Sequence, residues 1–217
     1  MKFVALYSAG KDSMLSLYRM IQQGHTPLCL IIMYNKEADR SWFHGVTTDL
    51  LEATANSLGI PIERIVCTGD SYVEDQERKL REVRERGAEA AVFGDIDIEG
   101  HREWNEERCE NTGLACIMPL WHEPREALVA EFIESGFKAM IKSVDLSCLD
   151  ESFLGKVLDE RVVEELVAAG SDACGENGEY HTFVFDGPLF SHPLPIRTGE
   201  IVNFTTHAAI DIVLAEE

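Results

Sequence analysis

Residues 2–23 read KFVALYSAGKDSMLSLYRMIQQ, and this stretch indicates a strand, a tight loop and a helix in succession. The apolar run at residues 2–7 is typical of a buried strand. From Ser13 to Gln23 apolar side chains recur at helical spacing, which predicts a helix. The loop between these elements should therefore lie at the carboxyl end of the first strand, where open parallel sheets bind their ligands.

The same alternation of strands and helices recurs up to residue 145. Strands are expected at residues 27–34, 61–67, 90–94, 115–119 and 138–144, and helices at 48–58, 72–86, 103–112 and 124–135. Strands that alternate with helices favour parallel βαβ units. We therefore predict an α/β fold with a parallel sheet, in a nucleotide-binding domain that spans residues 1–145.

The pattern changes after Asp145. A helix is expected at residues 159–169, and short extended runs at 180–185, 200–206 and 209–214 are separated by Gly and Pro. These features predict a smaller C-terminal α+β region at residues 146–217, which would carry the acceptor substrate.

Composition and charge exclude several classes of protein. A chain of 217 residues with 45% hydrophobic content can bury a full core, so intrinsic disorder is excluded. Nineteen basic against 39 acidic residues give a formal net charge of -20, which disfavours a nucleic-acid partner. The six cysteines are scattered without a metal-binding spacing, which indicates reduced thiols. No signal-peptide pattern or apolar run of roughly 20 residues is present, so we expect a cytoplasmic protein without a membrane partner.

The loop SAGKDS predicts a phosphate-binding site. Small residues let backbone N–H groups approach an anion, the following helix adds partial positive charge, and Lys11 can offset a phosphate charge. Asp12 is a candidate Mg²⁺ ligand, because this cation prefers carboxylate and phosphate oxygens, or it only caps the helix. The candidate nucleotide-binding residues in this loop are Ser8, Ala9, Gly10, Lys11, Asp12 and Ser13.

This loop is not a Walker A motif, which requires Gly at the position of Ala5 and Ser or Thr at that of Asp12. It resembles instead the SGGxDS loop of the N-type ATP pyrophosphatases, with Ala9 in place of the second-position glycine. A methyl group at Ala9 predicts an ordinary φ there, and hence a cradle slightly different from the usual form of that family.

A second polar segment, GDIDIEGHREW at residues 94–104, follows the strand expected at 90–94. It should emerge at the same edge of the sheet as SAGKDS, so the two loops could face one substrate. Arg102 could bind a phosphate in a bidentate manner, and Asp95 could assist with a metal or the acceptor. The alternative is an exposed charged helix, and this interpretation is favoured for Glu106, Glu107 and Arg108.

A third segment, CGENGEYHTFVFDGP at residues 174–188, places acidic and amide side chains between glycines before an expected strand. His181 could act as a general base for an amine nucleophile, and the glutamates could hold magnesium or ammonium. Gly, Asn and Asp are also ordinary turn formers, and a single histidine can be a packing residue. Both interpretations remain open on the residues alone.

These three segments, in this order and over nearly the whole chain, closely resemble the diphthine-ammonia ligase family. The string GENGEYHTFVFDGP is its most distinctive part. The resemblance implies an adenine nucleotide alpha-hydrolase fold of the HUP-like, Rossmann-like type, with ATP and Mg²⁺. It also implies that a substrate carboxylate attacks the α-phosphate of ATP, releasing pyrophosphate, and that ammonia then displaces AMP to form an amide. The acceptor would be a diphthine-bearing elongation factor, or another acceptor in the bacterial relatives.

The resemblance also implies roles for particular residues. Besides the SAGKDS loop, the nucleotide would contact Gly94, Asp95 and Arg102. The acceptor and ammonia would contact Asn177, Gly178 and Thr182. The residues implied in catalysis are Lys11, Asp12, Glu176, Glu179 and His181, with Asp12 as the metal ligand.

Two alternative functions remain open. Relatives with the same phosphate loop modify tRNA, a chemistry that commonly uses paired cysteines; Cys109 and Cys116 could meet across a helix end. A similar α/β architecture also binds ATP in sensor proteins that catalyse little, because a fold does not fix a function. A homodimer is the expectation from base rates for a cytosolic protein.

Overall fold

The computed structural model describes residues 1–42, 44–68 and 70–215. Its contacts divide the chain into two compact units, one formed by residues 1–8 and 12–122 and the other by residues 9–11 and 123–217. The division therefore lies earlier than the boundary expected near residue 145. The physical reason is that β7 (Lys138–Asp145) pairs in the antiparallel sheet of the second unit and not in the parallel sheet of the first.

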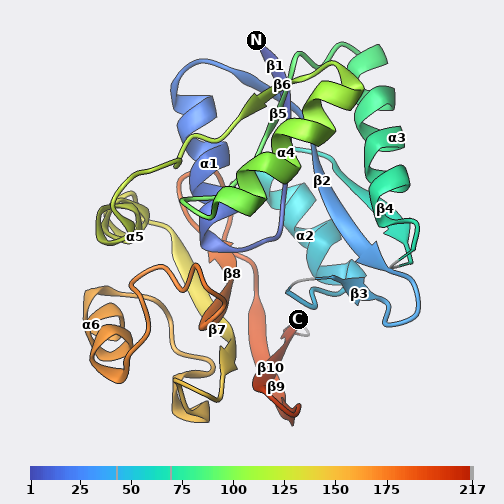
Figure 1. The fold of residues 1–217 in the computed structure, drawn as a ribbon. Coiled ribbons are helices and arrows are strands. Elements are labelled where there is room, and N and C mark those ends of the chain that lie inside the picture. The colour runs from blue at the N-terminus through green and yellow to red at the C-terminus, as the bar shows by residue number, and fades with distance from the viewer. Residues whose placement is uncertain (43, 69, 216–217) are drawn as a thin grey trace. The chain divides into compact units, whose positions relative to one another are not determined.

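The first unit contains a parallel sheet, which confirms the predicted α/β class (Figure 1). β1 pairs with β2 on one side and with β5 on the other, β4 extends the sheet beyond β2, and β6 extends it beyond β5. A short antiparallel strand, β3, pairs with the end of β2. The strands are β1 (Lys2–Leu6), β2 (Thr26–Asn35), β3 (Arg40–Ser41), β4 (Ile62–Cys67), β5 (Ala90–Val92) and β6 (Ala115–Ile117).

The helices of this unit follow the strands as the apolar spacing predicts. They are α1 (Lys11–Gln22), α2 (Thr48–Leu58), α3 (Tyr72–Glu85) and α4 (Glu99–Thr112). Gly59 and Gly113 end α2 and α4 in the left-handed conformation, which a residue without a Cβ adopts without strain. Two helices begin earlier than expected: α1 at Lys11 and α4 at Glu99, so that both polar loops are shorter than their sequences suggested.

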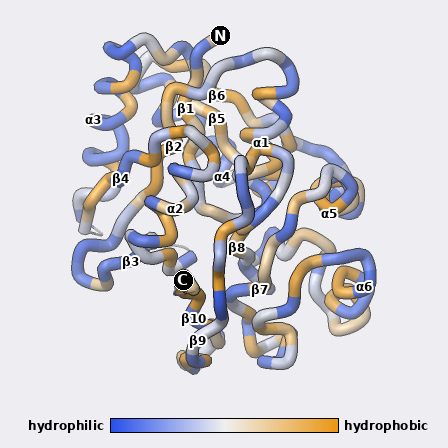
Figure 2. Tube along the Cα trace, turned by 180° about the vertical axis from the view of Figure 1, so that it is seen from behind, coloured by the Kyte–Doolittle hydropathy of each residue, from blue (hydrophilic) through white to orange (hydrophobic). Residues whose placement is uncertain are grey.

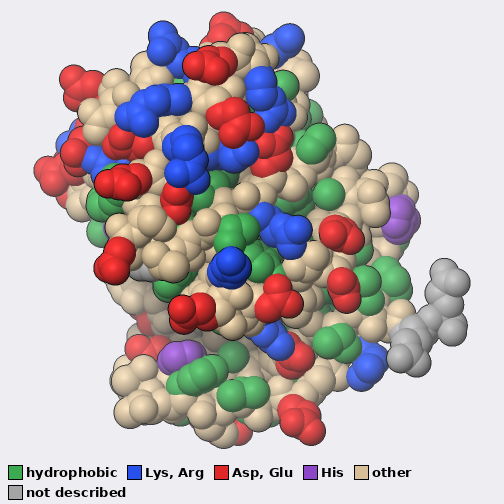
Figure 3. Space-filling model, turned by 90° about the vertical axis from the view of Figure 1, so that its right-hand side faces the viewer, with side chains coloured by type: hydrophobic (Ala, Val, Ile, Leu, Met, Phe, Trp, Pro, Cys, Tyr) green, Lys and Arg blue, Asp and Glu red, His purple; other side chains and the backbone are tan. Residues whose placement is uncertain are grey.

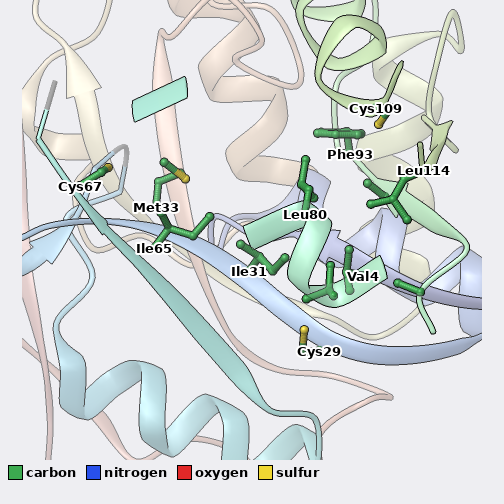
Figure 4. Close-up of a cluster of buried hydrophobic side chains, with 13 residues drawn as sticks. Val4, Cys29, Ile31, Met33, Ile65, Cys67, Leu80, Phe93, Cys109 and Leu114 are labelled. Atoms are coloured by element: carbon green, nitrogen blue, oxygen red, sulfur yellow. The ribbon is translucent and has the colours of Figure 1, made fainter. Parts of the chain in front are cut away.

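One core cluster of this unit lies between the sheet and helices α3 and α4. Figure 4 draws it, with Val4 and Ile31 from neighbouring strands and Leu80 from α3. Figure 2 shows the corresponding hydrophobic stretches along β1 and β2, whereas α3 is largely hydrophilic. The apolar side chains of β1 and β2 thus pack against the apolar face of the amphipathic helix α3.

The second unit contains an antiparallel sheet with the strand order β8, β7, β10, β9, as an α+β region should. Its core includes Ile141, Tyr180 and Phe183, all nearly inaccessible to solvent. Asp159 caps α6 by accepting a hydrogen bond from the backbone N–H of Val162. Besides β7, the elements are α5 (Arg125–Glu134), a 3₁₀ turn (Glu151–Phe153), α6 (Glu160–Ala169), β8 (Tyr180–Asp186), β9 (Ile196–Asn203) and β10 (His207–Leu214).

Acidic and basic side chains are interspersed on the face that Figure 3 shows, and Lys and Arg form no continuous basic surface there. Among the described helices, none combines the length and the apolar character that crossing a bilayer demands.

Candidate functional site

The strand order places two of the predicted polar loops together at the carboxyl edge of the first sheet. From β1 the chain continues to β2 and β4 on one side, whereas β5 and β6 lie on the other side. β1 and β5 therefore flank the point where the strand order reverses, which is where open α/β sheets bind ligands. Residues 8–13 follow β1, and Gly94 follows β5. A Cβ atom at Gly94 would lie 2.8 Å from the backbone nitrogen of Ser13, so the two loops are in direct backbone contact.

The hydroxyl groups of the first loop brace it internally. The Oγ atoms of Ser8 and Ser13 are 3.1 Å apart, and the backbone N–H of Ser8 donates to Ser13 Oγ at 3.3 Å. Because α1 begins at Lys11, both Asp12 and Ser13 lie in its first turn, where the helix dipole favours an anion. The loop thus has the position and the local charge expected of a phosphate-binding element.

Ala9 corrects one sequence-based expectation. Its φ is 69°, in the left-handed region, although its methyl group predicted an ordinary φ. A non-glycine residue pays roughly 1–2 kcal/mol for this conformation. The surrounding hydrogen bonds offset that cost: the backbone N–H of Val184 donates to the carbonyl of Ala9 at 2.9 Å, and that of Lys11 donates to Thr182 Oγ1 at 3.0 Å. Ala9 therefore has a left-handed backbone, the conformation that favours glycine.

These bonds also place Ala9 to Lys11 within the second unit. The side chain of Thr182, which the resemblance assigned to the acceptor, holds the first residue of α1. The Lys11 side chain is only 4% exposed; its ammonium donates to the carbonyl of Cys174 and lies 5.2 Å from the centre of the Tyr180 ring. The Lys11 ammonium therefore lies against the backbone of the segment that precedes β8.

The GENG segment forms a turn immediately before β8. The carboxylate of Glu179 accepts hydrogen bonds from the backbone N–H and the side-chain amide of Asn177, at 3.0 and 3.1 Å. Glu176 and Gly178 are half-buried, and Asn177 is exposed. Gly178 has a φ of 92°, which explains a glycine at this position. The structure thus brings together Lys11, Thr182, Glu176, Asn177 and Glu179 within the second unit.

Asp172 and Arg125 also belong to this group, although neither is among the site residues predicted from the sequence. The carboxylate of Asp172 accepts hydrogen bonds from the turn and from Arg125. The available signal was local: an Asp two residues before the CGENG string is typical of an Asx-turn. The pairing with Arg125, 47 positions away, has no sequence signature.

His181 is uncharged at neutral pH. Burial, together with the positive charge of Lys11 and the neighbouring His207, lowers its pKa to about 4, and Glu179 opposes this shift. A neutral imidazole can accept a hydrogen bond from an N–H group, so the protonation state suits the predicted role of base. The low pKa also means that His181 is a weak base.

The lowered pKa predicts a pH dependence of stability. Between pH 6.5 and about 4 the unfolded chain binds a proton at His181 and the folded chain does not, so stability falls as the pH falls. We expect the loss to reach about 3 kcal/mol at pH 4 relative to His181→Gln. Urea unfolding of both proteins at pH 7, 5 and 4 measures it, with the exposed His192→Gln as control. Parallel pH profiles for the chain and His181→Gln would contradict the buried, neutral imidazole.

The loop after β5 is fixed by its own helix. Asp95 accepts a hydrogen bond from the side chain of Asn105 at 2.7 Å and lies 3.0 Å from the His101 ring nitrogen. Arg102 pairs with Glu99 and Glu106 of α4, and its guanidinium lies 5.9 Å from the centre of the Trp121 ring. The geometry thus gives Arg102 the ion pairs of a charged helix surface, and its binding of phosphate stays a prediction.

Arg108 corrects a second expectation. The sequence favoured an exposed charged residue, yet the Arg108 side chain is only 5% exposed. It pairs with Glu77 of α3 and Glu107, and its guanidinium lies 4.7 Å from the centre of the Trp104 ring. Burial of the aliphatic stem against an aromatic ring, with the charge paired across two helices, accounts for the difference.

Cys109 and Cys116 do meet, as their spacing suggested. The two thiols form a hydrogen bond that raises the pKa of Cys109 and lowers that of Cys116, while burial raises both. Across the ranges 1–42, 44–68 and 70–215, the structure shows no group of three or more His, Cys, Asp or Glu side chains arranged to hold a metal ion.

The sequence is similar to proteins of one family along both units. Residues 1–116 match the diphthamide synthase N-terminal domain, and residues 124–217 match the diphthamide synthase C-terminal domain. The diphthine-ammonia ligases of Homo sapiens and Rattus norvegicus are each 30% identical to the chain over 96% of its length and 87% of theirs. That of Schizosaccharomyces pombe is 28% identical over 95% of the chain and 38% of its own length.

A solved structure, the predicted subunit of a tRNA methyltransferase from Methanocaldococcus jannaschii, aligns with 87% of this chain and 98% of its own, at 18% identity and a TM-score of 0.47. The family itself follows from the two domain matches, which together cover nearly all residues. The chain belongs to the diphthamide synthase family.

Proposed function

We propose that this protein is an ATP-dependent ligase that converts a carboxylate, that of diphthine on an elongation factor, into an amide with ammonia. The observation that carries the proposal is the similarity to diphthine-ammonia ligases over 96% of the chain. The phosphate loop at the reversal of the strand order supports it, because amide formation from a carboxylate requires an energy source such as ATP. Such an enzyme would act in the cytoplasm.

The proposed reaction has two steps. A carboxylate oxygen of the acceptor attacks the α-phosphorus of ATP, the bond to the bridging oxygen breaks, and pyrophosphate leaves. The nitrogen of ammonia then attacks the carbonyl carbon of the acyl-adenylate, a proton is lost from nitrogen, and AMP leaves as the amide forms. Adenylation is needed because a carboxylate offers no good leaving group, and AMP supplies one.

The residues of the phosphate loop would act in the first step. Ser8, Gly10 and Ser13, with the first turn of α1, would bind the phosphates, and Lys11 would offset the charge that develops on the departing pyrophosphate. Gly94 allows the second loop to approach, and Asp95 and Arg102 would lie beside the nucleotide.

The third segment, at residues 174–188, would act in the second step. Neutral His181 can accept the proton that the attacking nitrogen loses, and the carboxylates of Glu176 and Glu179 can attract ammonium and orient it. Asn177, Gly178 and Thr182 would complete this side, Thr182 through the backbone of Lys11.

Magnesium would enter with the nucleotide and not as a resident ion. Mg²⁺ is commonly held by one or two carboxylates together with substrate phosphates, which fits a half-buried Asp12 at the start of α1 and the lack of a larger ligand cluster among the described residues. Bound there, the ion would neutralise phosphate charge. A homodimer remains part of the proposal on general grounds.

Identification of the nucleotide product tests this function. The purified protein is incubated with α-labelled ATP, Mg²⁺ and ammonium, with and without a diphthine-bearing elongation factor. We expect AMP and pyrophosphate that depend on the factor. AMP formed equally without the factor would redirect the search to another acceptor, and AMP that depends on added tRNA would favour a tRNA-modifying enzyme. ADP, or bound ATP without turnover, would contradict the ligase.

A further inference from the structure

The carboxylate of Asp172 binds the backbone of three consecutive residues. Its Oδ1 accepts hydrogen bonds from the backbone N–H groups of Cys174 and Gly175, at 2.7 and 2.9 Å. Its Oδ2 accepts one from the backbone N–H of Glu176, at 2.9 Å. The Asn177 side chain and the guanidinium of Arg125 also donate to Oδ2, at 3.3 and 2.8 Å. One side chain thus fixes the turn from residue 174 to residue 177.

The same turn holds the ammonium of Lys11. The carbonyl of Cys174, which shares a peptide group with the Gly175 N–H bound by Asp172, accepts a hydrogen bond from Lys11 Nζ. Gly175 has a φ of 64°, and a Cβ atom there would lie 2.6 Å from a ring carbon of Tyr180. The Tyr180 hydroxyl in turn donates to the carbonyl of Ala173 at 2.7 Å. The turn therefore has little freedom to shift while Asp172 is bound to it.

We propose that Asp172 is a positioning residue, which sets the location of the Lys11 ammonium through the turn that carries the Cys174 carbonyl. This inference rests on the proposed function, because it assigns Lys11 to the phosphate step. Asp172 touches no reacting atom itself and acts through the turn. Asn cannot replace Asp172, because both carboxylate oxygens accept hydrogen bonds. An Asn side chain would turn its NH₂ group toward the N–H donors that now bind one of these oxygens.

A double-mutant cycle tests the coupling between Asp172 and Lys11. The kcat/KM of amide formation is measured for the wild-type protein, Asp172→Asn, Lys11→Met and the double variant. We expect Asp172→Asn alone to lose about 100-fold, because misplacing a group by about 1 Å has an effect of this size. We expect the double variant to lie within about 3-fold of Lys11→Met, because Asp172 then has no ammonium left to position.

A matched control separates positioning from stability. Asp159 caps α6 through a single backbone hydrogen bond at 2.8 Å, so Asp159→Asn perturbs an aspartate of the same unit that has no contact with the turn in the described hydrogen bonds. Asp159→Asn should leave kcat/KM within about 2-fold of wild type. In the double variant with Lys11→Met, the fold-change in kcat/KM should equal the product of the two single fold-changes, because the two sites are independent. The positioning role would be overturned if the losses in kcat/KM of Asp172→Asn and Lys11→Met multiplied in the double variant. Wild-type turnover in Asp172→Asn would overturn it as well.

Two further measurements keep the inference testable. If Asp172→Asn does not fold, Arg125→Met removes one donor to the carboxylate and should lose about 10-fold in the same cycle. An NMR titration of the His181 imidazole needs no turnover: the Lys11 charge lowers the pKa of His181, so release of the ammonium should raise it in Asp172→Asn and not in Asp159→Asn. An unchanged pKa would overturn the inference, whereas wild-type protein that forms no AMP would contradict only the proposed function.

Discussion

Lys11→Met should lower kcat/KM for amide formation by about 100- to 1000-fold, the effect of removing one preorganised charge-stabilising donor. The site needs a local positive charge because the chain carries a formal net charge of -20, which repels a polyphosphate. Lys11 lies in the first turn of α1, and Met nearly preserves its volume, so the change removes charge rather than packing. Steady-state kinetics with ATP, ammonium and the diphthine-bearing factor measures the loss.

Lys138→Met is the matched control for this prediction. Lys138 pairs with Asp186 at 2.8 Å in the same unit, and its side chain is 57% exposed, so the same chemical change should leave turnover at the wild-type level. Lys11→Met should also raise the pKa of His181, because the lysine charge contributes to lowering it. Wild-type turnover in Lys11→Met would mean that Lys11 only holds the Cys174 turn and does not act on the phosphates.

Much of the fold can be predicted because local signals and tertiary packing agree. In α2 the apolar spacing and the terminal Gly59 lead to the same bounds that the structure has. β3, with only two residues, offers no periodicity and depends on pairing with β2. The boundary between the two units was predicted too late in the chain for a similar reason. In sequence, β7 looks like one more strand in a series that alternates with helices, and only its pairing with β8 and β10 shows that it belongs to the antiparallel sheet.

The candidate site is predictable where its chemistry is local and unpredictable where it depends on long-range contacts. The composition of the phosphate loop and its position after β1 are both predictable from the local sequence. The left-handed φ of Ala9 depends on a hydrogen bond from Val184, and the burial of Arg108 depends on Glu77 of another helix. No local sequence pattern encodes these partners. Local propensity therefore predicted the wrong φ for Ala9 and the wrong solvent exposure for Arg108.

Gly94→Ala should destabilise the first unit by about 1–3 kcal/mol and weaken ATP binding by about 10- to 100-fold. The added Cβ would lie 2.8 Å from the backbone nitrogen of Ser13 and 3.0 Å from the carbonyl carbon of Asp12. These are backbone atoms, so no side-chain rotation can relieve the contact. The loop after β5 and the first turn of α1 must therefore separate, which displaces the predicted phosphate site.

Gly100→Ala, in the same segment, should change the stability in the opposite direction. A Cβ atom at Gly100 would meet nothing within 4 Å, and this residue lies in α4, so alanine should stabilise the helix by about 0.5–1 kcal/mol. Calorimetric titration with ATP and urea unfolding of both variants separate affinity from stability. If Gly94→Ala binds ATP as tightly as Gly100→Ala, the close approach of the two loops has no part in nucleotide binding. If only Gly94→Ala loses affinity, the contact at the reversal of the strand order is what shapes the phosphate site.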